Sequence, residues 1–220
     1  MNSATMTTSQ VADDRIGFLG KTYGMLALCI AAGSIGAFMS MGLAFPHEHP
    51  FMMLFIMIGG IFLVQAVRHM PGINFIALLA FGAITGMAIA PLVGMVAAKS
   101  GSLVTQAFMT TAVAFISLTA YTLISRRDFS FLKGFVWTGL IAMIVLGLSN
   151  YFFFESSILS LTLSGVGVLL FSAFILYDTS NILRDYPNEE YISAALTLYL
   201  DVFLLFQHVL AMFGMLGNDD

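Results

Sequence analysis

The sequence predicts an all-α polytopic membrane protein, folded as one compact bundle of seven transmembrane helices. Of its 220 residues, 59% are hydrophobic and only 9% are charged, and the mean hydropathy is +0.95. A soluble domain carries about 25% charged residues, so this chain has too few to cover a folded surface in water. Long charge-free stretches are the third indication, because a helix needs about 20 apolar residues to cross the hydrocarbon core of a bilayer.

The charged residues divide the chain into the predicted spans. The first six charge-free stretches are 22–47, 49–67, 69–98, 100–125, 134–154 and 156–177. We expect the sixth span to continue past Asp178 toward Arg184. The seventh span joins the stretches 191–200 and 202–218 across a single acid, Asp201. The alternative is a broken sixth helix followed by a re-entrant final segment.

The distribution of Lys and Arg predicts the orientation in the membrane. With seven spans, one end of the bundle carries seven of the eight basic residues. These seven are Arg15, Lys21, Arg68, Arg126, Arg127, Lys133 and Arg184, and the opposite end carries Lys99. The positive-inside rule then places the N-terminus in the cytoplasm and the C-terminus outside. We therefore expect a cytoplasmic polar tail at 1–20, a membrane domain at 21–216 and a short external tail at 217–220.

Composition and motifs argue against several functions. The single cysteine, Cys29, allows no intramolecular disulfide and no multi-cysteine metal site. The chain has no His-Glu-x-x-His, phosphate-loop, Gly-x-Ser-x-Gly or Gly-Leu-Gly-Asp motif, and no basic patch that indicates nucleic-acid binding. We therefore expect no enzymatic activity. An intramembrane aspartyl protease also uses two aspartates on neighbouring spans and is the alternative, but the residues that flank Asp178 and Asp201 do not match one.

Two acids inside predicted spans are the main candidates for chemistry. A charged side chain at the centre of a span costs about 2.5–3.5 kcal/mol on insertion scales, so Asp178 and Asp201 need a reason to be there. Asp178 is six residues before Arg184, and Asp201 is ten residues after Tyr191. These spacings place the acids roughly 9 Å and 15 Å from the same end of two antiparallel helices. The two carboxyl groups are therefore expected to meet.

Such a pair is expected to sense protons. Two carboxylates at hydrogen-bonding distance in a low dielectric cannot both ionise cheaply, so they share a proton. The sequence thus predicts a proton sensor near physiological pH which, when opened, offers hard oxygen ligands to a cation. Two alternatives remain: Asp178 reaches out to the cytoplasmic interface, and Asp201 is an isolated protonated acid.

Three further polar residues are candidates for the same site. Arg68 ends the second span and is the nearest basic residue that could neutralise the acids from inside, although it also fits a positive-inside anchor. His208 lies seven residues after Asp201 on the same helix face, with Gln207 beside it. Both are candidates for lining a polar path, although a single helical histidine is more often satisfied locally.

Two segments carry a resemblance to a known family. Phe174–Ile182 (FILYDTSNI) and Leu198–Phe206 (LYLDVFLLF) strongly resemble the paired motifs of the sixth and seventh helices of the Bax-inhibitor-1 family. The likeness extends more loosely over residues 20–216. The looser matches are Thr85-Gly86 with Ala90-Pro91-Leu92, which resemble the third helix, and Ser125–Leu132, which resembles the basic loop before the fifth.

The resemblance implies a fold and two competing functions. It implies a seven-helix bundle whose last helix is central and is surrounded by the other six. It also implies a pH-sensitive calcium leak in which Asp178 and Asp201 form the sensor and a calcium site. Arg68 falls where some bacterial members place an arginine that bonds these acids. Calcium is then the permeant ion or a transient ligand, with no tightly bound cofactor.

The second function comes from the bacterial character of the motif. Thr179-Ser180-Asn181 resembles the YccA-like branch, whose members modulate the membrane protease FtsH. This likeness implies a bacterial inner-membrane protein that restrains a protease without transporting ions.

Overall fold

The computed structural model describes residues 8–217 and contains seven helices that are long and apolar enough to cross a membrane. The long helices are α1 (Thr8–Met39), α3 (Pro50–Val67), α4 (Ile73–Lys99), α5 (Gly101–Ser125), α6 (Lys133–Ser149), α7 (Ser157–Arg184) and α8 (Tyr191–Leu216). The short elements are α2 (Phe45–Glu48), the 3-10 turn η1 (Ser130–Leu132) and the π-helical turn η2 (Asn150–Phe154), which continues α6. The prediction of an all-α polytopic membrane protein is confirmed.

The last two spans are continuous helices. α7 runs unbroken through Asp178, and α8 runs unbroken through Asp201. The alternative of a broken sixth helix with a re-entrant final segment is therefore wrong. At the other end of the chain α1 begins at Thr8, so residues 8–20 of the predicted polar tail are helical. The rest of the predicted tails, at 1–7 and 218–220, lies outside the described residues.

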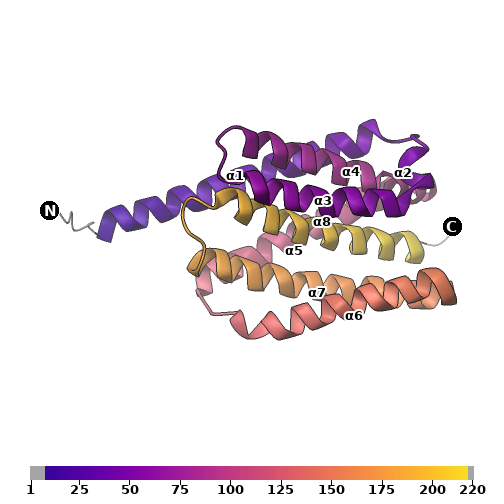
Figure 1. Cartoon of the computed structure of the whole chain (residues 1–220). Coiled ribbons are helices and arrows are strands. Elements are labelled where there is room, and N and C mark those ends of the chain that lie inside the picture. The colour runs from indigo at the N-terminus through magenta and orange to yellow at the C-terminus, as the bar shows by residue number, and fades with distance from the viewer. Residues whose placement is uncertain (1–7, 218–220) are drawn as a thin grey trace.

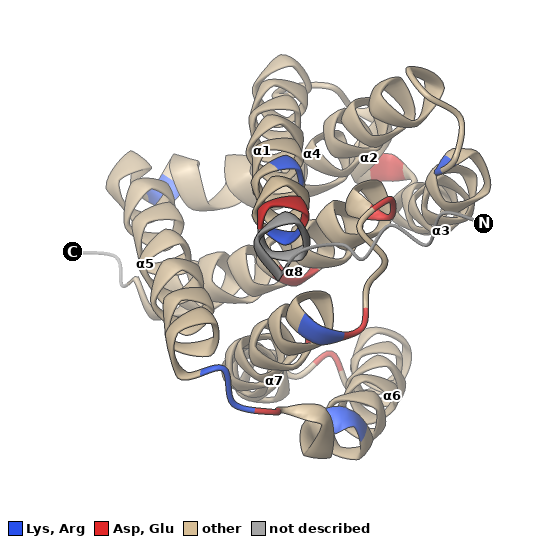
Figure 2. Cartoon of the chain, turned by 90° about the vertical axis from the view of Figure 1, so that its left-hand side faces the viewer, with Lys and Arg blue, Asp and Glu red and all other residues tan. Residues whose placement is uncertain are grey.

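The helices run side by side and alternate in direction, so their connections gather at two ends (Figure 1). One end holds the start of α1 and the connections at 68–72, 126–132 and 185–190, and we call it the basic end. Figure 2 views this end and shows blue Lys and Arg segments on its connections. The opposite end holds α2, the turn between α4 and α5, and the end of α8.

The last helix is central, as predicted. α8 packs most extensively against α7, then against α1, α5 and α4, and lightly against α3, and it lies in the middle of the end-on view (Figure 2). Leu196, Leu198, Leu205 and Leu210 of α8 are completely buried. The expectation that six helices surround α8 needs a correction: within the described chain five pack against it, while α6 is held at the periphery by α7.

The closest helix pair is α1 with α4, because small residues let the two backbones approach. A Cβ atom on Gly36 would lie 2.2 Å from the carbonyl oxygen of Ala83, and one on Gly86 would lie 1.9 Å from that of Gly33. A larger residue at either glycine would force the helices apart. This packing fixes α1 and α4 as the frame against which the middle of α8 rests.

Candidate functional site

The structure brings Asp178 of α7 and Asp201 of α8 into contact. The carboxyl groups are close enough for one to hydrogen bond to the other. An ionised carboxylate is only an acceptor, so this contact is favourable when a proton or a cation lies between the two groups. Asp201 is buried at 5% exposure, and its Oδ2 atom has no hydrogen-bond partner among the residues described.

Local sequence explains why the acids meet. α7 and α8 are antiparallel, and the connection at 185–190 is too short to separate them, so α8 makes its most extensive contact with α7. Ser193, Ala194 and Ala195 are small and buried in the first turns of α8, which allows close packing. The proximity of the pair thus follows from helix spacing, as the sequence indicated, while its role as a sensor stays a prediction.

Tyr186 covers the pair on the side of the basic end. Its hydroxyl lies 3.3 Å from Oγ1 of Thr197, which is one turn before Asp201 on the same face of α8. Burial raises the pKa of the Tyr186 phenol; the bond with Thr197 opposes this shift, and the nearby acids, Asp178 among them, add to it. At neutral pH the phenol is therefore protonated and can donate a hydrogen bond.

Arg15 of α1 holds this cover in place. Its Nη1 atom donates hydrogen bonds to the carbonyl oxygen of Tyr186 at 2.6 Å and to Oδ1 of Asn188 at 2.9 Å, and its Nη2 atom donates to the carbonyl oxygen of Ile182. The guanidinium also lies over the ring of Phe18 at 4.7 Å. Sequence reasoning missed this clamp and counted Arg15 only among the basic residues, because nothing near it in the chain marks a partner more than 160 positions away.

Arg68 contacts a different acid in this structure. Its Nη2 atom lies 3.6 Å from Oε1 of Glu190, and its Nε atom donates to Nε2 of His69 at 3.0 Å. Among the residues described, neither Asp178 nor Asp201 forms an ion pair with Arg68. Arg68 thus joins the end of α3 to the start of α8, and its predicted part in a gate stays a prediction.

His208 and Gln207 lie on α8 away from any polar cluster. The His208 ring stacks on Phe171 with a centroid distance of 5.5 Å and an interplanar angle of 15°. The ring also fills the space beside Gly167, where a Cβ atom would come within 2.5 Å of it. In the part of the chain that the structure describes, neither His208 nor Gln207 makes a side-chain hydrogen bond. Their predicted place on a polar path therefore stays a prediction.

The site offers few ligands to a metal ion. No group of three or more His, Cys, Asp and Glu side chains close enough to hold a metal occurs within residues 8–217. Calcium takes about six to eight oxygen ligands, and the aspartate pair alone supplies at most four. The remaining ligands would have to be water or backbone oxygens, an arrangement that suits a passing ion better than a resident one.

These features define a class: a polytopic α-helical membrane protein with a pair of ionisable groups in contact inside its transmembrane bundle. The family model described as "Inhibitor of apoptosis-promoting Bax1" matches residues 15–218. The chain therefore belongs to the Bax inhibitor-1 family, which confirms the resemblance.

Three relatives show how widely this sequence is shared. The chain is 34% identical to an uncharacterized protein of Pseudomonas aeruginosa, over 100% of this chain and 97% of that one. It is 33% identical to Protein lifeguard 4 of Mus musculus, over 95% of this chain and 89% of that one. It is also 33% identical to Bax inhibitor 1 of Schizosaccharomyces pombe, over 94% and 79% of the two chains. The similarity thus extends over essentially the whole membrane domain.

Proposed function

We propose that this protein is a pH-sensitive cation leak, with calcium as the permeant ion, gated by the Asp178–Asp201 pair in a bacterial inner membrane. The observation that carries the proposal is the contact of two carboxyl groups, of which Asp178 is partly buried and Asp201 is buried with one oxygen that has no partner among the described residues. A buried group of this kind is costly unless a proton or cation joins it. In this proposal the basic end faces the cytoplasm.

The direction of the pH response follows from the shared proton. At low pH one proton bridges the carboxyl groups and holds α7 to α8. As the pH rises the proton is lost, and two negative charges in contact repel each other strongly in a low dielectric. The pair then separates or attracts a cation, so conductance increases with pH.

α3 is the helix best suited to move. It packs mainly against α4 and touches α8 only lightly. Two polar links join it to α8: the Arg68–Glu190 ion pair at 3.6 Å, and the hydrogen bond from Ser193 to Gln65 at 2.9 Å. A deprotonated aspartate pair would compete with Glu190 for Arg68, which would weaken the first link and loosen α3.

Calcium influx into dye-loaded liposomes that contain the purified protein tests the proposal. Flux is recorded between about pH 6 and pH 8 for the wild type and for the variants Asp178→Asn and Asp201→Asn. Each variant leaves only one ionisable carboxyl group in the pair. Glu189→Gln is the matched control, because it removes a carboxylate from the exposed α7–α8 connection. We expect flux that rises with pH in the wild type and the control, and loss of that pH dependence in both Asn variants.

If calcium flux into liposomes with the protein does not exceed that into empty liposomes at any pH, the proposed leak is refuted. That result would favour the second candidate, a modulator of the FtsH protease without transport. One feature of the fold fits that candidate: α6 lies at the edge of the bundle with most of its surface exposed, including Trp137 and Ile141. Such a face can pack against a membrane helix of another protein as readily as against lipid.

A further inference from the structure

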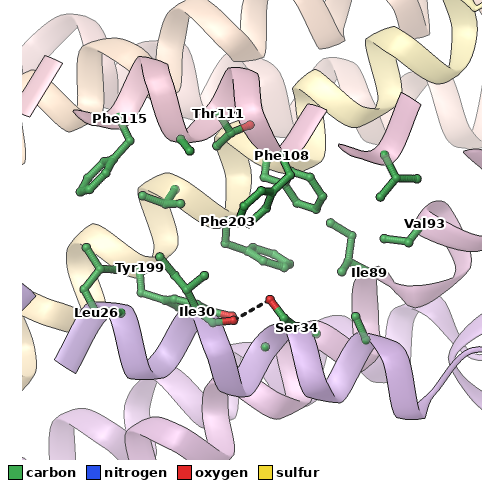
Figure 3. Close-up of a pocket in the computed structure, with 18 of the residues that line it drawn as sticks. Leu26, Ile30, Ser34, Ile89, Val93, Phe108, Thr111, Phe115, Tyr199 and Phe203 are labelled. Carbon is green, nitrogen blue, oxygen red and sulfur yellow. Dashed lines mark hydrogen bonds between the residues drawn. The ribbon is translucent and has the colours of Figure 1, made fainter. Parts of the chain in front are cut away.

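A groove opens sideways between α1 and α5, and neither Asp178 nor Asp201 lines it. Both helices pack against α4 and α8, but they make little contact with each other. The space between them has a volume of about 690 Å³. Figure 3 shows α1 and α5 on its two sides, with Phe203 of α8 between them. A molecule beside the bundle can therefore reach the central helix, α8, through this groove.

On α5 and α4 the wall of the groove lies nearer the α4–α5 turn, whereas on α1 it extends from Tyr23 to the end of the helix. On α5 its wall extends from Val104, close to the start of that helix, to Ile116. This α5 segment covers about 18 Å, and the α1 wall from Tyr23 to Phe38 covers about 22 Å, so the groove is somewhat longer than one leaflet of a hydrocarbon core about 30 Å across. On α4 the wall includes Ile89 and Val93, in the second half of that helix.

The wall of the groove offers almost no free polar group. Most of its hydroxyl groups bond to carbonyl oxygens four residues earlier in their own helices. These are Ser34, Thr105 and Thr111, at 2.9, 3.4 and 2.8 Å. The Tyr199 hydroxyl bonds to Thr85 of α4, and the buried Tyr23 hydroxyl has no hydrogen-bond partner among the described residues. A buried water needs about three hydrogen-bond partners, and the single free hydroxyl of Tyr23 does not supply them, so the wall of the groove favours an apolar occupant.

We propose that the groove binds one fatty-acyl chain of a bilayer phospholipid from the leaflet nearer the α4–α5 turn. The mouth lies between two membrane spans, where the surrounding medium is hydrocarbon, and the lining is mostly apolar. The small residues Ala27 and Ala37 of α1 line the groove together with Phe203 and Phe206 of α8. The acyl chain completes the contact between α1 and α5 that the protein itself leaves open. This site does not depend on whether cations pass the aspartate pair.

Photo-crosslinking with a phospholipid that carries a diazirine in its acyl chain tests the site. The full chain is reconstituted in bilayers with this lipid and illuminated, and the labelled residues are mapped by mass spectrometry. Phe203 is only 8% exposed, whereas Ile141 of α6 is 62% exposed on the outer surface. We expect adducts on α8 at residues 202–206 as well as on α6.

A pair of matched variants decides whether the groove carries the label. Ala112→Trp places a large side chain on the α5 wall of the groove, and Ala142→Trp places one on the exposed face of α6. We expect the first variant to lose the α8 adducts and the second to keep them.

Three outcomes would overturn the proposal. One is labelling of α6 without labelling of α8 in the wild type, a result that decides the matter even if Ala112→Trp does not fold. Another is α8 labelling that persists in folded Ala112→Trp. The third is modification of Phe203 by a water-soluble probe, or a crosslink to a second protein chain at the groove, because another occupant would then fill it.

Discussion

Replacement of Arg15 by alanine should release the connection that covers the aspartate pair. The guanidinium reaches the carbonyl oxygens of Tyr186 and Ile182 and the side chain of Asn188. Arg15→Ala removes all three hydrogen bonds and leaves a gap between the start of α1 and the connection at 185–190. The helices themselves should remain, because the Arg15 head group contacts the apolar core at the ring of Phe18, near one end of the bundle.

The size of the effect follows from the kind of bond that is lost. A hydrogen bond to a charged group contributes about 1.5–3 kcal/mol net. Arg15 is partly exposed, so water replaces part of what the variant removes. We therefore expect the local closing of the connection to lose about 2 kcal/mol, the strength of one such bond. Since 1.4 kcal/mol is tenfold in an equilibrium constant, opening should increase about 30-fold.

Hydrogen exchange of the protein in bilayers, followed by mass spectrometry, measures this opening. The amide of Asp185 bonds to the carbonyl oxygen of Asn181 at 2.7 Å, and the amide of Glu190 bonds to that of Pro187 at 3.0 Å. Both amides should exchange about 30-fold faster in Arg15→Ala. Lys133→Ala is the control, because it removes an exposed charge from the same end, and Lys133 has no ion pair or side-chain hydrogen bond within residues 8–217.

Arg15→Lys tests whether the positive charge of Arg15 or the shape of its guanidinium group holds the connection at 185–190. Lysine keeps the positive charge but lacks the planar fork that serves several acceptors at once. An intermediate increase in exchange is therefore expected. Unchanged exchange in Arg15→Ala, or an equal increase in Lys133→Ala, would refute the clamp and reduce Arg15 to one basic residue among several.

Two matched glycine pairs test the close packing of the helices. Gly86→Ala should destabilise the protein by about 1–3 kcal/mol, because its Cβ atom would collide with the backbone of α1. Gly94→Ala on the same helix meets no atom within 4 Å, and should be neutral or stabilising by up to about 1 kcal/mol in unfolding experiments in detergent. Gly167→Ala should likewise cost about 1–3 kcal/mol by displacing the ring of His208, whereas Gly165→Ala, with no atom within 4 Å, should not. Equal stability within either pair would contradict the packing described here.

Part of the candidate site could be predicted because it depends on regular geometry. The depth of Asp178 and Asp201 follows from the fixed rise of an α helix, and their proximity follows from the short connection between two spans. The partners of Arg15 and Arg68 could not be predicted in this way. A long flexible side chain at the end of a bundle can reach several acceptors, and only the packing of the helices decides that Arg15 meets Tyr186 and that Arg68 meets Glu190.

The sequence by itself determined the membrane-spanning fold, since the length of each apolar stretch and the positions of the charges are properties of the chain alone. It did not determine which faces of the helices pack together. In lipid both the buried and the exposed face of a helix are apolar, so the pattern of hydrophobic residues does not distinguish them. The folded structure reveals that α6 is peripheral and that a groove separates α1 from α5, and it confirms the central place of α8 that the family resemblance implied.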